Sequence, residues 1–353
     1  MKYSIVLIVP HFGKFKSYFP LWLHSCKYNS TIHWLVFTDD QTPYDFPSNV
    51  TVYYTTFKEV VQRIQNLFDF KINLKSPYYL CEFKVTYGEA FQDYIKDYDF
   101  WGYCDTDLIW GNLREHITDE VLANHNKVSW RGHLTLFRNN RRINGLYKSP
   151  VNGLEYFKYA LANHTGYIVA FDERIINNIF ESNGEQIYTN LRFADLKIRS
   201  STFFLLHFLP QNDYKNRNQI FMWEEGNLFR LYTHNNIIFK ESYAYIHFLK
   251  RDMAFSKSLN FEYRFLIVPN RFINYADEIT VNTINTLSRK KVYWKYLISR
   301  FSLQYIKSKL SYHSNKRAFK KEFYFLPVQS YQCKIPTPKH DVMYNESQAS
   351  LSS

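Results

Sequence analysis

The stretch "FWGYCDTDLIWGNL" (residues 100–113) places two acidic side chains between two apolar runs. Aromatic residues precede Asp105, and the run after Asp107 is again apolar and aromatic. A short apolar run of this kind is typical of a strand buried on both faces of a parallel sheet. Ligands of open α/β sheets bind beyond the carboxyl ends of the strands. We therefore expect Asp105 and Asp107 to lie beside a ligand.

The residues before this stretch alternate between two patterns. Continuous apolar runs predict buried strands, and apolar residues spaced three and four apart predict helices. In chain order we expect a strand at 4–9, a helix at 17–28, strands at 32–38 and 50–54, helices at 57–68 and 82–98, and a strand at 99–104. This alternation predicts an α/β fold with a mostly parallel sheet flanked by helices.

The later pattern is less regular. We expect a strand pair at 127–139 around Gly132, helices at 152–163 and 172–181, and a β-hairpin at 227–248 that turns at Asn235 and Asn236. We place one domain at 1–275, a basic helical segment at 276–330, and a polar tail at 331–353 that lacks periodicity and is predicted to be disordered.

The chain has 353 residues, which suffices for one large domain with a sizeable core. Its formal net charge is +12, and residues 289–321 carry many Lys and Arg but no acid. Such an excess favours anionic partners. Apolar residues in 289–310 recur at helical spacing between the cations, which suits an anionic membrane surface. The alternatives are a helix packed on the domain and a nucleic-acid-binding helix.

The cysteines and the apolar runs bear on the compartment. Four cysteines without CxxC pairing argue against a disulfide scaffold or a zinc ribbon, and suit a reducing compartment. The longest apolar runs are too short to span a bilayer. We therefore expect a cytoplasmic protein, with peripheral binding at the inner face of the plasma membrane as an option.

Two carboxylates one residue apart cannot both be buried without partners, because each unpaired charge costs several kcal/mol. A hard divalent cation resolves this, since Mg²⁺ and Mn²⁺ prefer carboxylate and phosphate oxygens. We therefore predict that Asp105 and Asp107 bind Mn²⁺ or Mg²⁺ against a diphosphate. Chance is the alternative: Asp97 and Asp99 form a second D-x-D, which we interpret as a solvent-exposed turn because it precedes the strand.

The layout resembles that of GT-A fold nucleotide-sugar glycosyltransferases. The matching parts are a strand and turn at 5–12, a second strand that ends on Asp39 and Asp40, and the D-x-D at 105–107. "CEFKVTYGEAFQDYIKDYDFWGYCDTDLIWGNLR" together with "RGHLTLFRNN" further resembles a group of bacterial transferases of this fold found with surface-polysaccharide genes. This closer resemblance covers about residues 1–250.

The resemblance implies roles for these residues on the donor side. Asp105 and Asp107 would hold the metal against the sugar-nucleotide diphosphate, and a late histidine, His247, would complete the metal site. Lys84 would reach the donor sugar or its phosphate, although a solvated helix charge is the alternative. The nucleotide would contact Pro10, His11, Phe12, Asp39, Asp40 and Lys250.

Other residues are candidates for the acceptor side. Gly132 permits a close approach of backbone, so we interpret Arg131, Gly132 and His133 as lining the acceptor. Asp172 or Glu173 would act as the base or orient the acceptor hydroxyl, unless the pair only complements a helix dipole. Glu225 is an acceptor-site acid or part of a loop.

The resemblance implies a metal-dependent glycosyltransferase with a UDP- or GDP-linked donor and a surface-glycan or lipid-linked acceptor, without nucleic acid. Two other functions fit the sequence. A phosphotransferase of the haloacid dehalogenase type would use Asp105 as its nucleophile, but its motif usually opens the chain. A nucleic-acid-binding protein would explain the charge, yet no zinc, RNP-like or helix-turn-helix pattern is visible.

Overall fold

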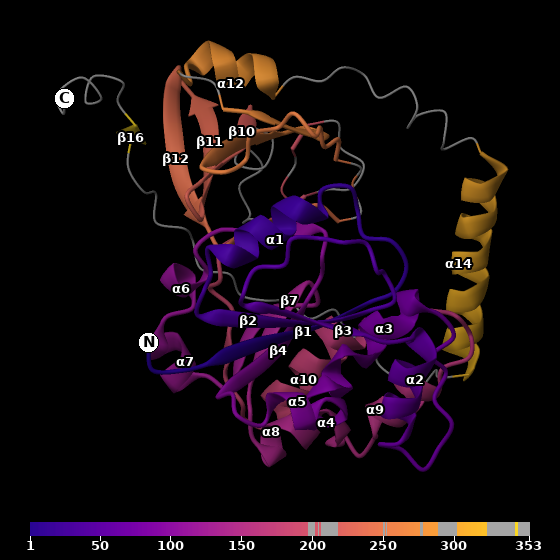
Figure 1. The fold of residues 1–353 in the computed structure, drawn as a ribbon. Coiled ribbons are helices and arrows are strands. Elements are labelled where there is room, and N and C mark those ends of the chain that lie inside the picture. The colour runs from indigo at the N-terminus through magenta and orange to yellow at the C-terminus, as the bar shows by residue number, and fades with distance from the viewer. Residues whose placement is uncertain are drawn as a thin grey trace.

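The computed structural model confirms the α/β class: a mainly parallel sheet is flanked by helices, and a second sheet lies on the far side of α1 (Phe19–Lys27) (Figure 1). The structure describes residues 1–196, 202–203, 205, 218–249, 251, 253–275, 278–288, 302–322 and 343–344.

The central sheet has seven strands in the order β3-β2-β1-β4-β7-β6-β8. Its strands are β1 (Ile5–His11), β2 (Ile32–Thr38), β3 (Val50–Tyr54), β4 (Phe100–Cys104), β6 (Lys127–Arg131), β7 (Leu134–Arg138) and β8 (Ile187–Tyr188). β1 to β4 run parallel to one another, and β7 runs antiparallel to both of its neighbours. The carboxyl ends of β1, β2 and β4 therefore lie at one edge of the sheet.

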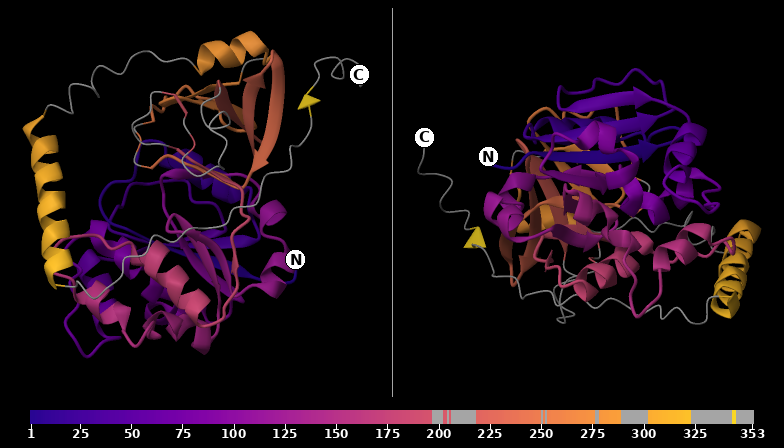
Figure 2. Two further views of the ribbon diagram at one scale, coloured as in Figure 1. Left: turned by 180° about the vertical axis from the view of Figure 1, so that it is seen from behind. Right: turned by 90° about the horizontal axis from the view of Figure 1, so that it is seen from below.

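Both faces of the sheet are covered, as the continuous apolar runs predict. Leu7 and Val9 of β1 pack with Trp22 of α1 in one cluster, while Val6 and Ile8 face the opposite cluster. The helices on that opposite face include α2 (Phe57–Gln65), α4 (Tyr87–Ala90), α5 (Gln92–Ile95), α8 (Arg141–Gly145), α9 (Tyr156–Ala162) and α10 (Ile176–Ser182) (Figures 1 and 2). α6 (Leu113–His116) and α7 (Asp119–Asn124) follow the D-x-D stretch.

The prediction of one continuous helix at 82–98 is wrong. The chain instead forms short turns: η1 (Pro77–Tyr79), α3 (Leu80–Phe83), η2 (Lys84–Thr86), and then α4 and α5. Thr86 Oγ1 donates to the Phe83 carbonyl, a local bond that competes with helical pairing. Phe91 leaves the helical region between α4 and α5 with φ −115° and ψ 25°. These breaks place Lys84 on a tight turn.

The second sheet is antiparallel, in the order β15-β14-β10-β11-β12-β16. Its strands are β10 (Gln219–Glu224), β11 (Asn227–His234), β12 (Ile237–Tyr243), β14 (Arg264–Val268), β15 (Arg271–Asn274) and β16 (Met343–Tyr344). The predicted hairpin is confirmed: β11 and β12 turn at Asn235 and Asn236, both of which have positive φ. α12 (Val281–Leu287) packs on this sheet through the buried Ile284.

A small third sheet joins the two larger ones. It consists of β5 (Leu108–Trp110), β13 (Tyr245–His247) and β9 (Phe193–Asp195), in that order. β5 follows β4 of the central sheet, and β13 follows β12 of the second sheet. Segments more than 130 residues apart in the chain thus become neighbours at the D-x-D.

α14 (Leu303–Glu322) lies at the side of the molecule in all views (Figures 1 and 2). Phe319 is buried, and the rings of Phe319 and Tyr312 lie 5.3 and 5.8 Å from that of Tyr167. Three further apolar side chains of α14 are exposed, by 76%, 46% and 65% respectively: Leu303, Ile306 and Leu310.

The C-terminal predictions are only partly within the described residues. Residues 289–301 of the predicted basic helix lie outside them, and so does the predicted tail except Met343–Tyr344, which pairs with β12 as β16. Of the helices that the structure describes, none combines the length and the apolar character that a membrane crossing requires.

Candidate active site

The D-x-D lies between two strands of different sheets. β4 ends at Cys104, β5 begins at Leu108, and the intervening backbone is held from both sides. The Asp105 amide donates to the His133 carbonyl at 3.1 Å, and the Asp107 carbonyl accepts from the Phe248 amide at 2.9 Å. Both acids therefore stand at the carboxyl end of a buried strand, as predicted.

A cavity of about 640 Å³ opens beside these two acids. It extends from the end of β1 across the D-x-D to the turn between β6 and β7 and the start of η4, a π-helical turn (Phe171–Ile175). Of the residues predicted for the site, the cavity is lined by Pro10, His11, Phe12, Lys84, Asp105, Asp107, Arg131, Gly132, His133, Asp172, Glu173 and His247.

Asp105, Asp107 and His247 converge on one point beside the cavity. His247 Nε2 lies 3.3 Å from Asp107 Oδ1 and 3.9 Å from Asp105 Oδ2. Adjacent ligands held at about 2 Å from one ion stand about 3 Å apart. The 3.3 Å separation is close to this spacing and the 3.9 Å separation is wider, and the two carboxylates supply the oxygen ligands that Mn²⁺ and Mg²⁺ prefer. Burial lowers the pKa of His247, but Asp107 and Asp195 outweigh it and raise the pKa to about 10.

Lys84 forms the second charged centre of the site. Its Nζ donates to Asp105 Oδ1 at 2.6 Å and to the Gly132 carbonyl at 2.8 Å, and lies 3.8 Å from Asp172 Oδ2. Burial lowers the pKa of Lys84, but Asp105 and Asp172 outweigh it and raise the pKa above its usual range. Lys84 is therefore a fixed, buried cation, rather than a solvated helix charge.

Asp172 and Glu173 enter the site on the first turn of η4. Ala170, directly before it, has φ 57° and donates its amide to Glu82 Oε1 at 2.8 Å. Asp172 is buried, and burial raises the pKa of its carboxyl well above the usual range. Glu173 accepts from the Gly132 amide at 3.0 Å and lies 3.3 Å from the Arg131 guanidinium. Both acids therefore lie in the first turn of η4, where an acidic side chain complements the helix dipole, and both also line the cavity.

The end of β1 and the turn after it line the cavity as predicted, but the two acids that follow β2 do not. Pro10, His11 and Phe12 line the cavity. Asp39 and Asp40 do not line it: Asp39 Oδ1 accepts from the Gly13 amide at 2.7 Å, and Asp40 binds the Lys14 ammonium at 2.6 Å and the Phe15 amide. A buried carboxylate at this position supports the turn rather than contacting a ligand directly.

Three other residues predicted for the site are not where the sequence analysis placed them, or lie outside the described residues. Glu225 is exposed in the turn between β10 and β11, with φ 45°, and does not line the cavity. His133 packs on His247, with ring centroids 4.3 Å apart, so it belongs to the metal-ligand cluster rather than to an acceptor wall alone. Lys250 lies outside the described residues.

The sequence analysis missed one buried acid that lines the cavity, Asp195, and one that supports its wall, Glu82. Asp195 Oδ1 lies 2.9 Å from His247 Nδ1, and Asp195 also belongs to a second group of ligand-type side chains with His133 and His247. Glu82 anchors the segment before η4. Asp195 ends a strand of only three residues, and Glu82 lies in a pattern that predicts an ordinary helix, so neither carries a local pattern that marks it.

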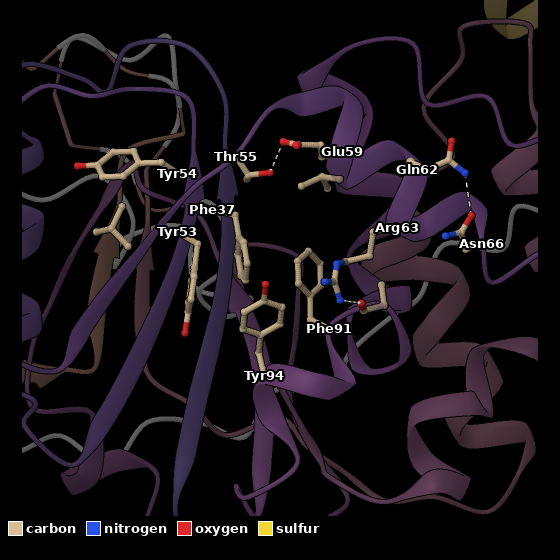
Figure 3. A pocket seen from close by; sticks show the side chains of 13 residues that line it. Phe37, Tyr53, Tyr54, Thr55, Glu59, Gln62, Arg63, Asn66, Phe91 and Tyr94 are labelled. Atoms are coloured by element: carbon tan, nitrogen blue, oxygen red, sulfur yellow. Dashed lines mark hydrogen bonds between the residues drawn. The ribbon is translucent and has the colours of Figure 1, made fainter.

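A second cavity, of about 810 Å³, lies between β3, α2 and α5 (Figure 3). Among the residues that line it are the aromatic side chains Phe37, Tyr53, Tyr54, Phe91 and Tyr94. Its one acid, Glu59, is occupied in capping α2 at Thr56, and its one cation, Arg63, binds Asp93 at 2.7 Å. The residues lining this cavity offer no set of metal ligands.

The fold and the site define an α/β protein with a candidate divalent-metal centre at the carboxyl edge of its sheet. The chain belongs to a family of unknown function, DUF6625, whose model matches residues 7–276. No curated protein matches it. Among solved structures, a galactosyltransferase, LgtC, in complex with donor and acceptor sugar analogues aligns over 54% of this chain and 75% of that chain, with 12% identity and a TM-score of 0.32. At this level the likeness carries no information on activity.

Proposed function

We propose that this protein is a metal-dependent glycosyltransferase. It would move a sugar from a UDP- or GDP-linked donor to a surface-glycan or lipid-linked glycan acceptor. The observation that carries the proposal is the convergence of Asp105, Asp107 and His247 beside a cavity that also holds the buried Lys84 cation. A departing nucleoside diphosphate needs its charge neutralised, and a divalent ion together with a fixed ammonium group supplies that.

On the donor side, Asp105, Asp107 and His247 would hold Mn²⁺ or Mg²⁺, which stabilises the diphosphate charge when bound. Lys84 adds a second positive charge that Asp105 and the Gly132 carbonyl keep in place. Because this charge is already oriented before the reaction, little reorganisation is needed as negative charge develops.

The nucleoside would lie against the turn that follows β1. The His11 ring stacks on Phe15, with centroids 4.1 Å apart, and burial lowers the pKa of His11 below its usual value. His11 is therefore a neutral, flat surface at neutral pH. Such a surface suits stacking with a base or a ribose, and the Asp39 and Asp40 contacts keep the turn beneath it in place.

On the acceptor side, Asp172 is the group best placed to contact a sugar hydroxyl. Its raised pKa keeps the carboxyl protonated to a higher pH, so it can donate a hydrogen bond, and it accepts a proton once ionised. Glu173 is held by the Arg131 side chain and the Gly132 amide, which favours an orienting role for Glu173.

The phosphotransferase alternative requires Asp105 as a nucleophile. Asp105 Oδ1 is hydrogen-bonded to Lys84, and Oδ2 faces His247. An arrangement in which both acids converge with an imidazole favours metal ligation over nucleophilic attack.

The basic C-terminal region would bring the enzyme to its acceptor. We propose that residues 289–321 bind the anionic inner face of the plasma membrane from the cytoplasm. In the described part of this region, α14 exposes apolar side chains between lysines. The helix has no acidic residue before Glu322. The cations would attract an anionic surface, and the exposed apolar side chains would contact it.

The test is a thermal-shift titration with UDP and GDP, with and without Mn²⁺. The melting temperature should rise with one nucleotide only when Mn²⁺ is present, because a ligand bound to the folded state stabilises it by mass action. Asp105→Asn and Asp107→Asn should abolish the rise. Hydrolysis of a panel of nucleotide sugars with Mn²⁺ then identifies the donor.

The matched control is Asp97→Asn, in the exposed second D-x-D. It makes the same chemical change outside the site, so the nucleotide response should stay at the wild-type level. A response without metal, or one that survives both site substitutions, contradicts the proposal.

A further inference from the structure

The small third sheet brings Asp195 beside His247. β9 and β13 are parallel and in register, so that Asp195 pairs directly with His247. On the other side of β13, His247 pairs with Leu108, the residue that follows Asp107. Paired residues of adjacent strands project to the same face. Strand pairing therefore places the Asp195 carboxylate beside the His247 imidazole, and it brings the D-x-D, which directly precedes β5, to the same end of β13.

The contact between Asp195 and His247 determines which ring nitrogen faces the D-x-D. Asp195 Oδ1 lies 2.9 Å from His247 Nδ1, so a proton on Nδ1 is donated to this carboxylate. The opposite nitrogen, Nε2, then faces Asp107 at 3.3 Å. Both side chains are nearly buried, with 6% and 4% exposure. The hydrogen bond is thus shielded from water.

His133 restricts the ring from its flat side. Its ring centroid lies 4.3 Å from that of His247, and His133 Nδ1 is hydrogen-bonded to the Tyr245 hydroxyl at 3.0 Å. Between this ring and Asp195, His247 has little freedom to turn. The only described carboxylate on its Nδ1 side that contacts it is Asp195, whereas the D-x-D carboxylates lie on its Nε2 side.

We propose that Asp195 is a positioning residue for the metal centre. This proposal rests on the proposed function. By accepting a hydrogen bond from the Nδ1–H group, it would hold His247 with the Nε2 lone pair directed at the ion that Asp105 and Asp107 would bind. Carboxylate–histidine pairs of this kind fix the tautomer and increase the basicity of the ligand nitrogen, and their loss costs about ten- to hundredfold in metal affinity.

The experiment measures Mn²⁺ binding directly, by electron paramagnetic resonance of the free ion, together with the hyperfine coupling of a coordinated imidazole nitrogen. Asp195→Ala should weaken Mn²⁺ binding about ten- to hundredfold and reduce the imidazole coupling. Asp195→Asn should retain more of both, because its side-chain carbonyl can still accept a hydrogen bond from the Nδ1–H group. Neither readout requires a substrate.

Glu241→Gln is the control for a general loss of packing. Glu241 is a buried carboxylate that pairs with Arg230 in the second sheet, away from the cavity. This variant should keep the wild-type Mn²⁺ affinity and imidazole coupling. Equal loss in Glu241→Gln and Asp195→Ala overturns the positioning role, as does Asp195→Ala with wild-type affinity and coupling.

The two proposals fail in different ways. If the wild-type protein shows no Mn²⁺ binding that depends on Asp105 and Asp107, the proposed function fails. If that binding is present and carries an imidazole coupling that Asp195→Ala leaves unchanged, only the role of Asp195 is contradicted.

Discussion

Gly132 is the residue at which the site has no room for a side chain. A Cβ there would lie 2.2 Å from Asp172 Oδ2 and 2.8 Å from its Cγ. The Gly132 amide donates to Glu173 and its carbonyl accepts from Lys84. One backbone unit thus connects Glu173 with the buried cation and lies directly beside Asp172.

Gly132→Ala should therefore displace Asp172 and disturb Lys84. We expect a loss of stability of about 1–3 kcal/mol, as for other overpacked sites, and a decrease of about tenfold or more in kcat/KM for donor hydrolysis. Urea denaturation and steady-state kinetics measure the two effects. Gly145→Ala is the control, because its Cβ would meet only Glu89 Oε1 at 3.7 Å. Unchanged kinetics in Gly132→Ala would contradict this role of the glycine.

Single residues show what the sequence can and cannot predict about the site. The apolar pattern was sufficient to place Asp105 at the end of a buried strand, whereas His247 was selected by the family resemblance. Asp40 was misplaced because an acid at a strand end contacts either a ligand or its own turn, and only the Lys14 and Phe15 contacts decide between them. The position of Asp195 depends on a strand pairing between segments about fifty residues apart.

Among the elements, α3 supports η4 through a buried acid. Glu82 accepts from the amides of Ala170 and Val169, at 2.8 and 3.3 Å, and so anchors the segment that carries Asp172. Burial raises the pKa of Glu82 to about 7, although the backbone hydrogen bonds partly oppose it. The connection between these two elements therefore depends on pH.

Between pH 4.5 and about 7, the folded protein holds a proton on Glu82 that the unfolded chain has lost. The free energy of unfolding should therefore fall as the pH rises through this range, by up to about 3 kcal/mol from this group. Glu82→Gln should remove that part of the decrease in urea denaturation at pH 5 and pH 8. Glu181→Gln, an exposed change on α10, should show the same decrease in the free energy of unfolding between pH 5 and pH 8 as the wild type. If Glu82→Gln shows this full decrease as well, Glu82 is not its cause.

The element pattern was predicted well where burial is uniform and poorly where tertiary contacts interrupt it. β1, β2 and β4 are buried on both faces, so their apolar runs were sufficient. Apolar spacing alone suggested one helix at 82–98. It cannot reveal that Gly88 lies against Trp101, where a Cβ would be only 2.5 Å away, or that the chain turns at Phe91.

At the scale of the whole molecule, α14 has two opposite apolar faces. One contains Phe319 and Tyr312 and packs on Tyr167. The other contains Leu303, Ile306 and Leu310, spaced three and four apart and exposed. A helix anchored on one side and apolar on the other is suited to connect the protein to a surface.

Binding of the full-length protein to vesicles tests this role. We expect binding to vesicles that contain phosphatidylglycerol, weaker binding as salt is added, and little binding to neutral phosphatidylcholine. Ile306→Glu combined with Leu310→Glu should weaken sedimentation with the anionic vesicles about tenfold, because two apolar contacts are replaced by negative charges. The control is Ile237→Glu, an exposed apolar position in the second sheet. Equal binding by both variants would contradict a role for this face of α14.

The three-strand sheet has a consequence for biosynthesis. The D-x-D leaves the ribosome early, but the strand that carries its imidazole partner is made some 140 residues later and must align between two much earlier segments. Until that late strand is inserted, the candidate metal centre lacks its histidine. Competence for metal would therefore arise in one late assembly step, and a translation product that stops before residue 245 would be inert.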